Sequence, residues 1–522
     1  MPLVGIDLGT TFSCVACVGD GGVPTVIRDG QGNTEVPSVI SFDGRDAYVG
    51  CAAVERKGVL PHTIFELFKR DIGKPLDSAH GGAAPYEVGG FKFGAAGMSA
   101  ILLRYLKKQA IRHFRKTGEL DETDDRKVAL DAVITVPASF GDKERNETKL
   151  AGEAAGFRVV GMINEPTAAA LAFGLGRKEE LRILVFDLGG GTFDATLLRM
   201  ASGVATVEAT RGDNSLGGKD FDDLIERYLA AAAFRATGVH VPEERGFELQ
   251  RHARRAKHEL SECEQVEVAM THGGEDLVLT LHRKSTHSSL RVRPSGENHE
   301  FYFEERSTDL LHRCRAICET LFDEVSIETK AGTRRVRWSD IDEIVLAGGS
   351  CRMPMIAEMI ERVSGKRVQR HIEGFSYDTA IAVGAALYGV HREDVSDVLS
   401  HGMGVKVLED GRPRVDCLVE RDTRVPVTAE RSYRAPAGAV LEVYEGESRA
   451  PDECELRGRL ELNNPEGQVR IEMAWSSDGI LRVLADFPPH GRRELEIKNE
   501  DFQFGRRLAL LRERVASLTV HA

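Results

Sequence analysis

The chain contains Ile6-Asp7-Leu8-Gly9-Thr10-Thr11 near its start and Phe186-Asp187-Leu188-Gly189-Gly190-Gly191-Thr192-Phe193-Asp194 further on. In both stretches an apolar strand ends at an aspartate, a glycine–threonine turn follows, and a second strand begins. Glycine lets backbone N–H groups approach an anion closely, and threonine hydroxyls add hydrogen-bond donors. Either copy alone fits a plain hairpin turn. Two copies facing each other predict a phosphate-binding site.

The aspartates at the two strand ends predict a metal ion beside the phosphates. Asp7 and Asp187 are carboxylates, and Mg²⁺ prefers carboxylates while it keeps several of its waters. We therefore expect both residues to face Mg²⁺. Gly217-Gly218-Lys219 does not form a Walker A motif, because Asp220 follows the lysine instead of Ser or Thr.

A third strand and glycine turn, Ile344 to Pro354, fits the remainder of a nucleotide. Gly348 and Gly349 leave bare backbone against which a flat base or sugar could lie, and Arg352 can stack on an adenine. The three segments together predict a nucleotide site.

Composition excludes several classes of protein. The 522 residues are too many for one core, so two to four domains are expected. A formal net charge of −13 argues against broad nucleic-acid binding. No apolar run is long enough for a membrane span, and no basic and apolar leader precedes Leu3, so we expect a cytoplasmic protein with no membrane partner. The nine cysteines predict reduced thiols.

Strand and helix patterns alternate from residue 1 to about 390, which predicts an α/β fold. The predicted strands are apolar, β-branched and bounded by Gly, Asp or Pro: Leu3–Ile6, Val15–Val18, Val133–Val136, Ile183–Phe186, Ala195–Leu198 and Ile344–Leu346. After residue 400 short strands separated by turn signals predict an all-β sandwich. The polar, histidine-containing segment Thr271–His299 reads as a solvated insertion, with metal binding as the alternative. A short amphipathic helix is expected over Phe504–Leu518. The expected boundaries are a nucleotide-binding domain at 1–392, a linker at 393–403, a β-sandwich at 404–500 and a short helix or tail at 501–522.

The chain resembles the heat shock protein 70 family, the DnaK-type chaperones, over almost its whole length. The resemblance rests on the two turns above, on Leu216-Gly217-Gly218, and on four further stretches: Asn33–Ser38, Phe68–Arg70, Ile134–Ala138 and Ile163–Ala170. It implies an actin-like two-lobed ATPase domain followed by an all-β sandwich that binds peptides. It further implies that ATP or ADP binds with Mg²⁺ and that ATP is hydrolysed to ADP and phosphate. Actin and the sugar kinases share the two turns but not Ile163-Asn164-Glu165-Pro166-Thr167.

The resemblance assigns a role to each matching residue. Lys69 is expected to hold the γ-phosphate, although its spacing alone fits a surface lysine of an amphipathic helix. Glu165, Thr192 and Asp194 are expected to complete the environment of the attacking water and the metal; Glu165 alone fits a helix cap. The residues expected to cradle the phosphates or hold the adenosine are Gly9, Thr10, Thr11, Gly189, Gly190, Gly191, Thr192, Gly217, Gly218, Lys257, Ser261, Gly348, Gly349, Arg352 and Asp378.

The sandwich is similar to the family's peptide-binding domain, through Leu418–Pro426, Glu442–Glu447 and Asp478–Val483. Unfolded or extended peptide segments are the expected partners, held by backbone hydrogen bonds and a side-chain pocket. The candidate pocket residues fit plain sandwich core equally well: Val405, Val407, Tyr433, Ala439 and Leu441.

Several positions depart from the family's pattern. Arg254 stands in place of an acid near the adenosine, and His258 in place of a basic residue. The apolar interdomain linker is missing, Gly161 replaces an arginine that meets J-domain partners, and no helical lid is expected beyond residue 501. We therefore expect weak peptide binding with fast release, and weakened stimulation by a J-domain co-chaperone. The resemblance also implies a nucleotide exchange factor as a partner.

Two other functions remain open on the residues. The first is a nucleotide-switched adaptor or co-chaperone with weak client coupling, which the missing linker and lid favour. The second is a small-molecule kinase of the actin-like superfamily, which would need a general base for a substrate hydroxyl and would leave the sandwich without a purpose.

Overall fold

A computed structural model of the chain divides it into two compact units. Unit 1 comprises Met1–Ile183, Thr196–Thr210 and His371–Ala522, and unit 2 comprises Leu184–Ala195 and Arg211–Arg370. The structure describes residues 1–19, 21–56, 60, 63–74, 86–88, 90–125, 127–174, 180–201, 204–242, 246–285, 300–329, 332–368, 377–390, 395–399, 401–409, 411–462, 466–476, 481–487, 491–495 and 504–521.

The first sheet of unit 1 is built from buried, largely apolar strands. Its order is β11 (Arg158–Asn164), β10 (Asp131–Val136), β1 (Leu3–Asp7), β2 (Phe12–Val18) and β3 (Pro24–Val26), and β4 (Val36–Pro37) pairs with β2 off this path. β1 runs parallel to β10 and antiparallel to β2, which places the end of β1 beside the end of β10. The strands predicted at Leu3–Ile6, Val15–Val18 and Val133–Val136 lie within these elements.

Two glycines bring an apolar helix of unit 1 into direct backbone contact with a strand and with a second helix. Helix α10 (Tyr377–Val390) contacts β1 and α4 (Glu165–Gly174). A Cβ on Gly5 would lie 2.1 Å from the backbone nitrogen of Ala386, and one on Gly384 would lie 1.8 Å from the carbonyl oxygen of Ala168. The backbones are therefore in direct contact, which fixes the position of α4 and of its first residue, Glu165.

The second sheet has the order β20 (Glu343–Ala347), β12 (Leu181–Leu188), β13 (Phe193–Ala201), β14 (Val204–Asp213), β21 (Val395–Val398) and β24 (Arg424–Val425). The predicted strands Ile183–Phe186, Ala195–Leu198 and Ile344–Leu346 lie within it. Part of the segment expected as a linker is thus a strand: β21 pairs in parallel with β14 and antiparallel with β24. The next residue, Leu399, is 7% exposed and donates its N–H to the carbonyl oxygen of Thr423.

Unit 2 contains the long helices α5 (Gly218–Thr237), α6 (Gly246–Glu262) and α8 (Thr308–Glu324), and also α9 (Pro354–Ser364). The first part of the segment expected as a solvated insertion, Thr271–His299, forms a largely exposed hairpin that was not predicted. β15 (Gln265–His272) and β16 (Glu275–His282) form an antiparallel hairpin. His272 is 3% exposed, and its Nε2 lies 2.8 Å from the carbonyl oxygen of Val239. His287 and His299 lie outside the described residues.

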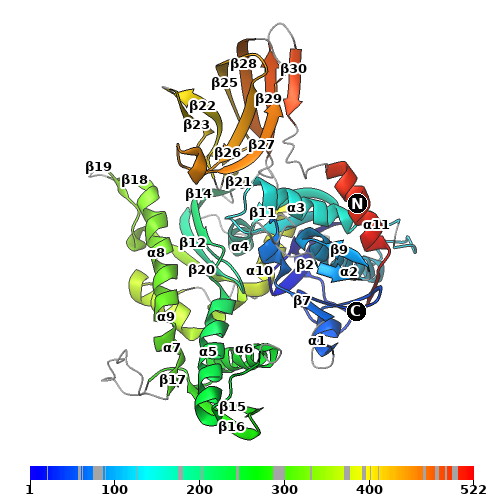
Figure 1. Ribbon diagram of the computed structural model, residues 1–522, viewed down its shortest axis with the longest axis vertical. Coiled ribbons are helices and arrows are strands. Elements are labelled where there is room, and N and C mark those ends of the chain that lie inside the picture. Colours follow the sequence, from blue (N-terminus) through cyan, green and yellow to red (C-terminus); the bar gives the residue numbers. More distant parts are fainter. Residues whose placement is uncertain are drawn as a thin grey trace. The chain divides into compact units, whose positions relative to one another are not determined.

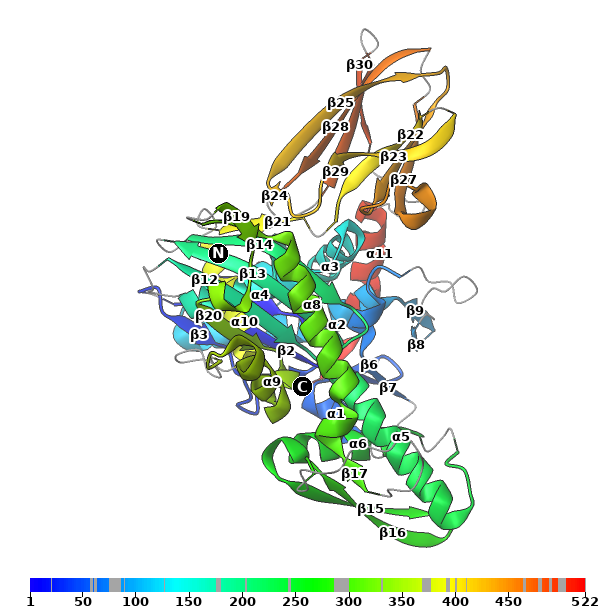
Figure 2. The same cartoon turned by 90° about the vertical axis from the view of Figure 1, so that its left-hand side faces the viewer.

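The predicted all-β module is a sandwich of two sheets (Figure 1 and Figure 2). One has the order β23 (Arg412–Val419), β22 (Met403–Glu409), β26 (Val440–Glu445) and β27 (Glu455–Glu461). The other has β25 (Val427–Ala435), β28 (Gly467–Trp475), β29 (Leu481–Phe487) and β30 (Gly491–Leu495). Alternate residues of both sheets fill the core, among them the fully buried Val443, Ile471 and Val483.

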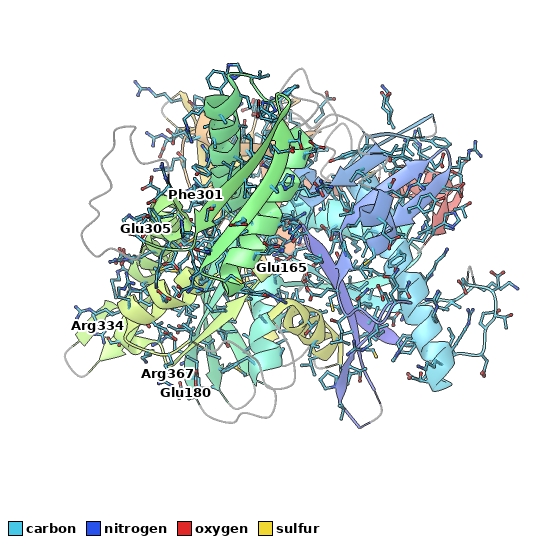
Figure 3. The ribbon with its side chains drawn as sticks, turned by 90° about the horizontal axis from the view of Figure 1, so that it is seen from below. Glu165, Glu180, Phe301, Glu305, Arg334 and Arg367 are labelled. Carbon is cyan, nitrogen blue, oxygen red and sulfur yellow. The ribbon has the colours of Figure 1, made fainter. Side chains whose placement is uncertain are left out.

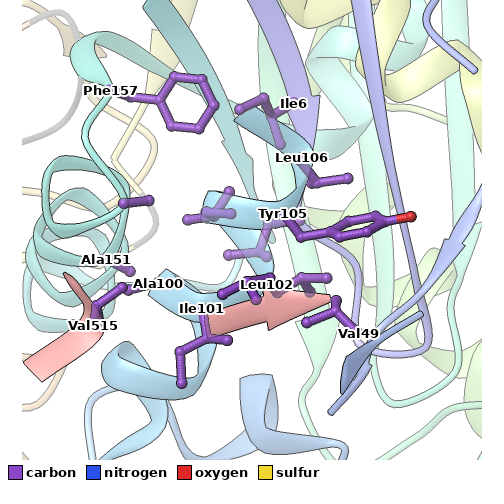
Figure 4. Packing of buried hydrophobic residues seen from close by; sticks show 14 of the residues in the cluster. Ile6, Val49, Ala100, Ile101, Leu102, Tyr105, Leu106, Ala151, Phe157 and Val515 are labelled. Atoms are coloured by element: carbon purple, nitrogen blue, oxygen red, sulfur yellow. The ribbon is translucent and has the colours of Figure 1, made fainter. Parts of the chain in front are cut away.

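The C-terminal residues form a clasp, which we define as α11 (Phe504–Ala516) and β31 (Thr519–His521). α11 packs on α2 (Ala95–Thr117) and α3 (Asp142–Ala154). β31 pairs in parallel with β6 (Asp46–Val49) and so extends a sheet that continues with β5 (Val39–Asp43) and β7 (Ile64–Glu66). Figure 4 shows Val515 with Ala100 and Ala151 in the core cluster of unit 1. Arg104 caps the end of α11 by donating to the carbonyl oxygens of Val515 and Leu518.

None of the described helices is long and apolar enough to cross a membrane. All nine cysteines are free thiols, in agreement with the expectation from the sequence.

Candidate functional site

The turn after β1 is fixed by its own hydrogen bonds. Gly9 donates its N–H to Ser13 Oγ at 3.1 Å, and Ser38 Oγ donates to the carbonyl oxygen of Gly9 at 2.7 Å. A Cβ on Gly9 would lie 1.9 Å from the carbonyl oxygen of Phe12, so only glycine fits. Thr10 and Thr11 are partly exposed at this turn. Ser13 and Ser38 were not predicted from the sequence, although Ser38 closes the matching stretch Asn33–Ser38.

Asp7 lies at the end of β1 and is 8% exposed. Thr135, on the neighbouring parallel strand β10, donates its hydroxyl to Asp7 Oδ1 at 3.1 Å. The hydrogen bond orients the carboxylate and satisfies one of its oxygens. Thr135 was also missed as a site residue; a lone hydroxyl inside the apolar run Val133–Val136 is the sequence signal for it.

The structure brings Lys69 and Glu165 together. Lys69 Nζ donates to Glu165 Oε1 at 2.6 Å, and the two side chains are 5% and 9% exposed. Glu165 begins α4 directly after β11, and Figure 3 labels its side chain. Lys69 is therefore a buried lysine and not a solvent-exposed one. Glu165 makes an ion pair in addition to starting α4.

The backbone before Lys69 is in an unusual conformation. Leu67 has φ 60° and ψ 13°, the left-handed region, and precedes the short 3₁₀ helix Phe68–Asp71. A non-glycine residue in this region costs about 1–2 kcal/mol and persists only where the surroundings fix it. This strain directs Lys69 inward, where its Nζ also lies 5.8 Å from the centre of the Phe140 ring.

In unit 2 the turn Gly189–Thr192 packs against the start of α5. The N–H groups of Gly218 and Lys219 donate to the carbonyl oxygens of Gly189 and Gly190, both at 2.9 Å. A Cβ on Gly217 would lie 2.6 Å from the backbone of Gly191. The predicted phosphate glycines on these two segments thus form one close-packed backbone arrangement, and any side chain at Gly217 would push it apart.

The third glycine segment meets the same turn. Ser350 Oγ donates to the carbonyl oxygen of Gly189 at 2.8 Å. Gly348 has φ 78°, and a Cβ there would lie 2.6 Å from Asp187 Oδ1. Asp187 and Asp194 are 5% and 2% exposed. Asp187, the turn and Gly348 are therefore neighbours within unit 2. Ser350 was missed, although it directly follows Gly349 in the matching stretch.

Lys257 is buried, and its ammonium group is bonded to other residues of unit 2. Its Nζ donates to the carbonyl oxygen of Gly218 at 2.7 Å and pairs with Asp222 at 2.8 Å. Burial lowers the pKa of Lys257 and raises the pKa of Asp222, and the charge of each partner opposes the shift of the other. Lys257 therefore ties α6 to the first residue of α5. Ser261 Oγ donates within its own helix, to the carbonyl oxygen of Lys257.

Basic side chains gather near Lys257. The pKa of His258 falls to about 4, first because of desolvation and then because of the charges of Lys257, Arg254 and Arg352. His258 is therefore neutral at pH 7, and the two arginines predicted to lie near the adenosine are close to it. Asp378 lies on α10, but its side chain is outside the described set.

The five candidate pocket residues of the sandwich lie in or against its core. Val405 and Leu441 are 1% and 7% exposed, and Val407, Tyr433 and Ala439 are partly buried beside them. The Tyr433 hydroxyl donates to Asp416 Oδ2 at 2.8 Å, and Arg431 donates to Asp416 Oδ1 at 2.6 Å. All five residues therefore lie together in the sandwich, and their positions fit both a pocket wall and the sandwich core.

The family model described as Hsp70 protein matches residues 3–502. A protein named chaperone protein DnaK, from Prochlorococcus marinus (strain MIT 9515), is 34% identical over 532 aligned positions, which cover 94% of this chain and 77% of that protein.

Proposed function

Because this chain belongs to the Hsp70 family, we propose that it works as an ATP-dependent chaperone whose N-terminal residues hydrolyse ATP and whose C-terminal sandwich holds exposed apolar peptide segments. The observation that carries the proposal is the buried ion pair between Lys69 and Glu165, at 2.6 Å. A buried pair of this kind is costly to desolvate, and it joins two residues that the family motifs assign to chemistry. We further propose that the domain boundaries are those expected from the sequence, with β21 inside the linker.

The carboxylates fit Mg²⁺. Asp7 and Asp187 each lie near the end of a buried strand, directly ahead of a glycine turn. We propose that they hold the ion through its water shell, where it would neutralise phosphate charge. We propose that Gly9, Thr10, Thr11 and the turn Gly189–Thr192 donate hydrogen bonds to nucleotide phosphates.

We propose that Lys69 holds the γ-phosphate and that Glu165 and Asp194 accept hydrogen bonds from the attacking water, with the Thr192 hydroxyl as a donor. Water attacks the γ-phosphorus, the bond to the β–γ bridging oxygen breaks, and ADP and phosphate leave. Positioning and charge neutralisation supply most of the rate in such reactions.

The adenosine is proposed to lie against Gly348, Gly349 and Arg352. Since Lys257 already bonds to Gly218, its contribution is proposed to be the placement of the α5 start beside the phosphates, with Ser261 and Asp378 nearer the sugar and base. The neutral His258 adds a polar group without adding charge.

A J-domain co-chaperone and a nucleotide exchange factor are proposed partners, and the cytoplasm is the proposed location, which suits nine free thiols.

One observation favours the second candidate, a nucleotide-switched adaptor with weak client coupling. The single helix described after the sandwich, α11, packs on α2 and α3. Measuring ATP turnover with and without an unfolded client separates the candidates, because the adaptor predicts no change.

Calorimetric titration with Mg·ATP tests the nucleotide site. Wild type should release heat on binding, and Asp187→Ala should not. Lys69→Ala should bind ATP but show no turnover. Asp43→Ala is the matched control, since Asp43 also ends a strand but its side chain is 70% exposed. A wild type that gives no heat with Mg·ATP would sink the proposal.

A further inference from the structure

The clasp adds a strand to a sheet whose opposite edge leads to Lys69. β31 pairs with β6, β6 pairs with β5, and β5 pairs with β7. One row of paired residues crosses all four strands: His521, Tyr48, Ser41 and Ile64. β7 ends at Glu66, so the chain passes from this sheet through Leu67 directly into the 3₁₀ helix that carries Lys69.

Hydrogen bonds from two directions hold β31 at the edge of the sheet. The N–H of Thr519 donates to the carbonyl oxygen of Arg45, directly ahead of β6, at 3.0 Å. On the side of α2, Lys108 Nζ donates to the carbonyl oxygen of Val520 at 2.9 Å. Val520 is itself 6% exposed. The strand is therefore fixed both to its neighbour β6 and to the helix that covers it.

The same sheet is tied to the candidate site at two further points. Ser38, directly ahead of β5, donates its hydroxyl to the carbonyl oxygen of Gly9 in the first phosphate turn, at 2.7 Å. Ser41 Oγ, on β5, lies 2.9 Å from the hydroxyl of Thr63, directly ahead of β7. The position of the sheet therefore affects both the first phosphate turn and the start of the segment that leads to Lys69.

Leu67 needs support from both sides because its backbone is strained. Its φ of 60° is costly for a residue with a side chain, and such a conformation persists only where the surroundings fix it. β7 fixes it on one side. On the other side Phe68, 1% exposed, belongs to the same core cluster as Leu518 and Val520, and α2 contacts the 3₁₀ helix, α11 and β31. Figure 4 shows Val49 of β6 in this cluster.

We propose that the clasp is a positioning element for Lys69. With β31 paired, the sheet and α2 hold Leu67 in its left-handed conformation and so hold Lys69 Nζ against Glu165. Without β31, β6 becomes the edge strand of a smaller sheet, Leu67 relaxes toward an unstrained conformation, and Nζ moves away from Glu165.

The consequence for catalysis rests on the role proposed above for Lys69. Because that role concerns the γ-phosphate and not the adenosine, loosening the clasp should lower kcat and leave the affinity for Mg·ATP unchanged. A contact that only stabilised the fold would not separate these two quantities.

Thr519→Pro removes the N–H that pairs β31 with β6, and Thr519→Ala keeps it and is the matched control. Hydrogen–deuterium exchange of the nucleotide-free full chain, resolved to single residues, follows the amide of Arg70, which donates to the carbonyl oxygen of Leu67 at 3.0 Å. Thr519→Pro should lower the protection of this amide about tenfold, and Thr519→Ala should not. The amide of Ile27, bonded to the carbonyl oxygen of Val15 beside β2, is the internal reference.

ATP turnover and calorimetric affinity are then measured on the same proteins. Thr519→Pro should show a kcat about tenfold lower than wild type with an unchanged Kd for Mg·ATP. Lys108→Met removes the bond from α2 to Val520, should give the same pattern, and serves if Thr519→Pro does not fold. Lys116→Met, at an exposed position of α2, is its control and should behave as wild type.

Wild-type protection of the Arg70 amide in both Thr519→Pro and Lys108→Met overturns the proposal, and so does an equal loss of protection at Ile27, which would mean that the whole unit had loosened. Lower protection at Arg70 with a wild-type kcat also overturns it. A wild type that hydrolyses no ATP counts against the function proposed above; the exchange measurement, which needs no nucleotide, then decides the role of the clasp.

Discussion

The ammonium of Lys69 donates a hydrogen bond of 2.6 Å to the carboxylate of Glu165, across 96 positions of the chain. Both side chains are buried, so each charge depends on the other for its compensation. The pair joins two residues proposed for the nucleotide site, and its contribution to the stability of unit 1 can be measured without nucleotide.

Removing one partner should destabilise the protein more than removing both. Lys69→Met leaves the Glu165 carboxylate buried and unpaired, which typically costs about 3–5 kcal/mol. The double variant Lys69→Met/Glu165→Gln should recover much of this loss. Thermal unfolding of the nucleotide-free protein at pH 7 measures both, and a double variant less stable than Lys69→Met would contradict the pairing.

Gly217→Ala should abolish Mg·ATP binding while the chain still folds. The added Cβ would lie 2.6 Å from the backbone of Gly191 and would push the phosphate turn away from the start of α5. Gly246→Ala is the control, because nothing lies within 4 Å of a Cβ there. Calorimetry should show wild-type affinity for Gly246→Ala, and equal affinities for the two variants would refute the packing argument.

The clasp should stabilise unit 1 together with the buried leucine that lies between its helix and its strand. Leu518 is 3% exposed in the same core cluster as α2, so Leu518→Ala should cost about 2–5 kcal/mol. Leu510, 48% exposed on α11, gives the matched substitution Leu510→Ala, which should cost little. The unfolding midpoints of the two variants decide the point; the clasp is merely peripheral if they coincide.

Thiol reactivity should follow burial in the native protein. Burial raises the pKa of Cys314 to about 12, and Cys318 is fully buried with its pKa raised as well. At pH 8 almost no thiolate is present at either residue, and both should resist iodoacetamide. Cys263 is exposed and should be alkylated first. Peptide mapping after a short pulse checks the order, and rapid labelling of Cys318 in folded protein would contradict it.

Local pattern was enough to predict much of this fold. Strands such as Val133–Val136 and Ile183–Phe186 are apolar, β-branched and bounded by turns, so they were identified from their residues alone. The family match confirms the fold class, the family and the ATP-dependent chaperone function predicted from the motifs. The roles of single site residues stay predictions.

Two strand pairings were not predicted from the sequence. Thr271 to His282 is polar enough to suggest an exposed insertion, yet its residues complete a hairpin with β15. Part of the expected linker is strand β21, because a partner strand was available on each side. Neither β14 nor β24 is adjacent to β21 in the chain, so the local periodicity of the sequence does not reveal this pairing.

The sequence by itself determined the family and the fold class, and it predicted which residues could bind phosphate and metal, because glycine, threonine and aspartate at a strand end have that capacity. Only the tertiary structure decided that Lys69 meets Glu165 and that Thr135 orients Asp7. The reason is physical: the charge state of a buried group depends on neighbours brought to it by folding, and those neighbours lie far away along the chain.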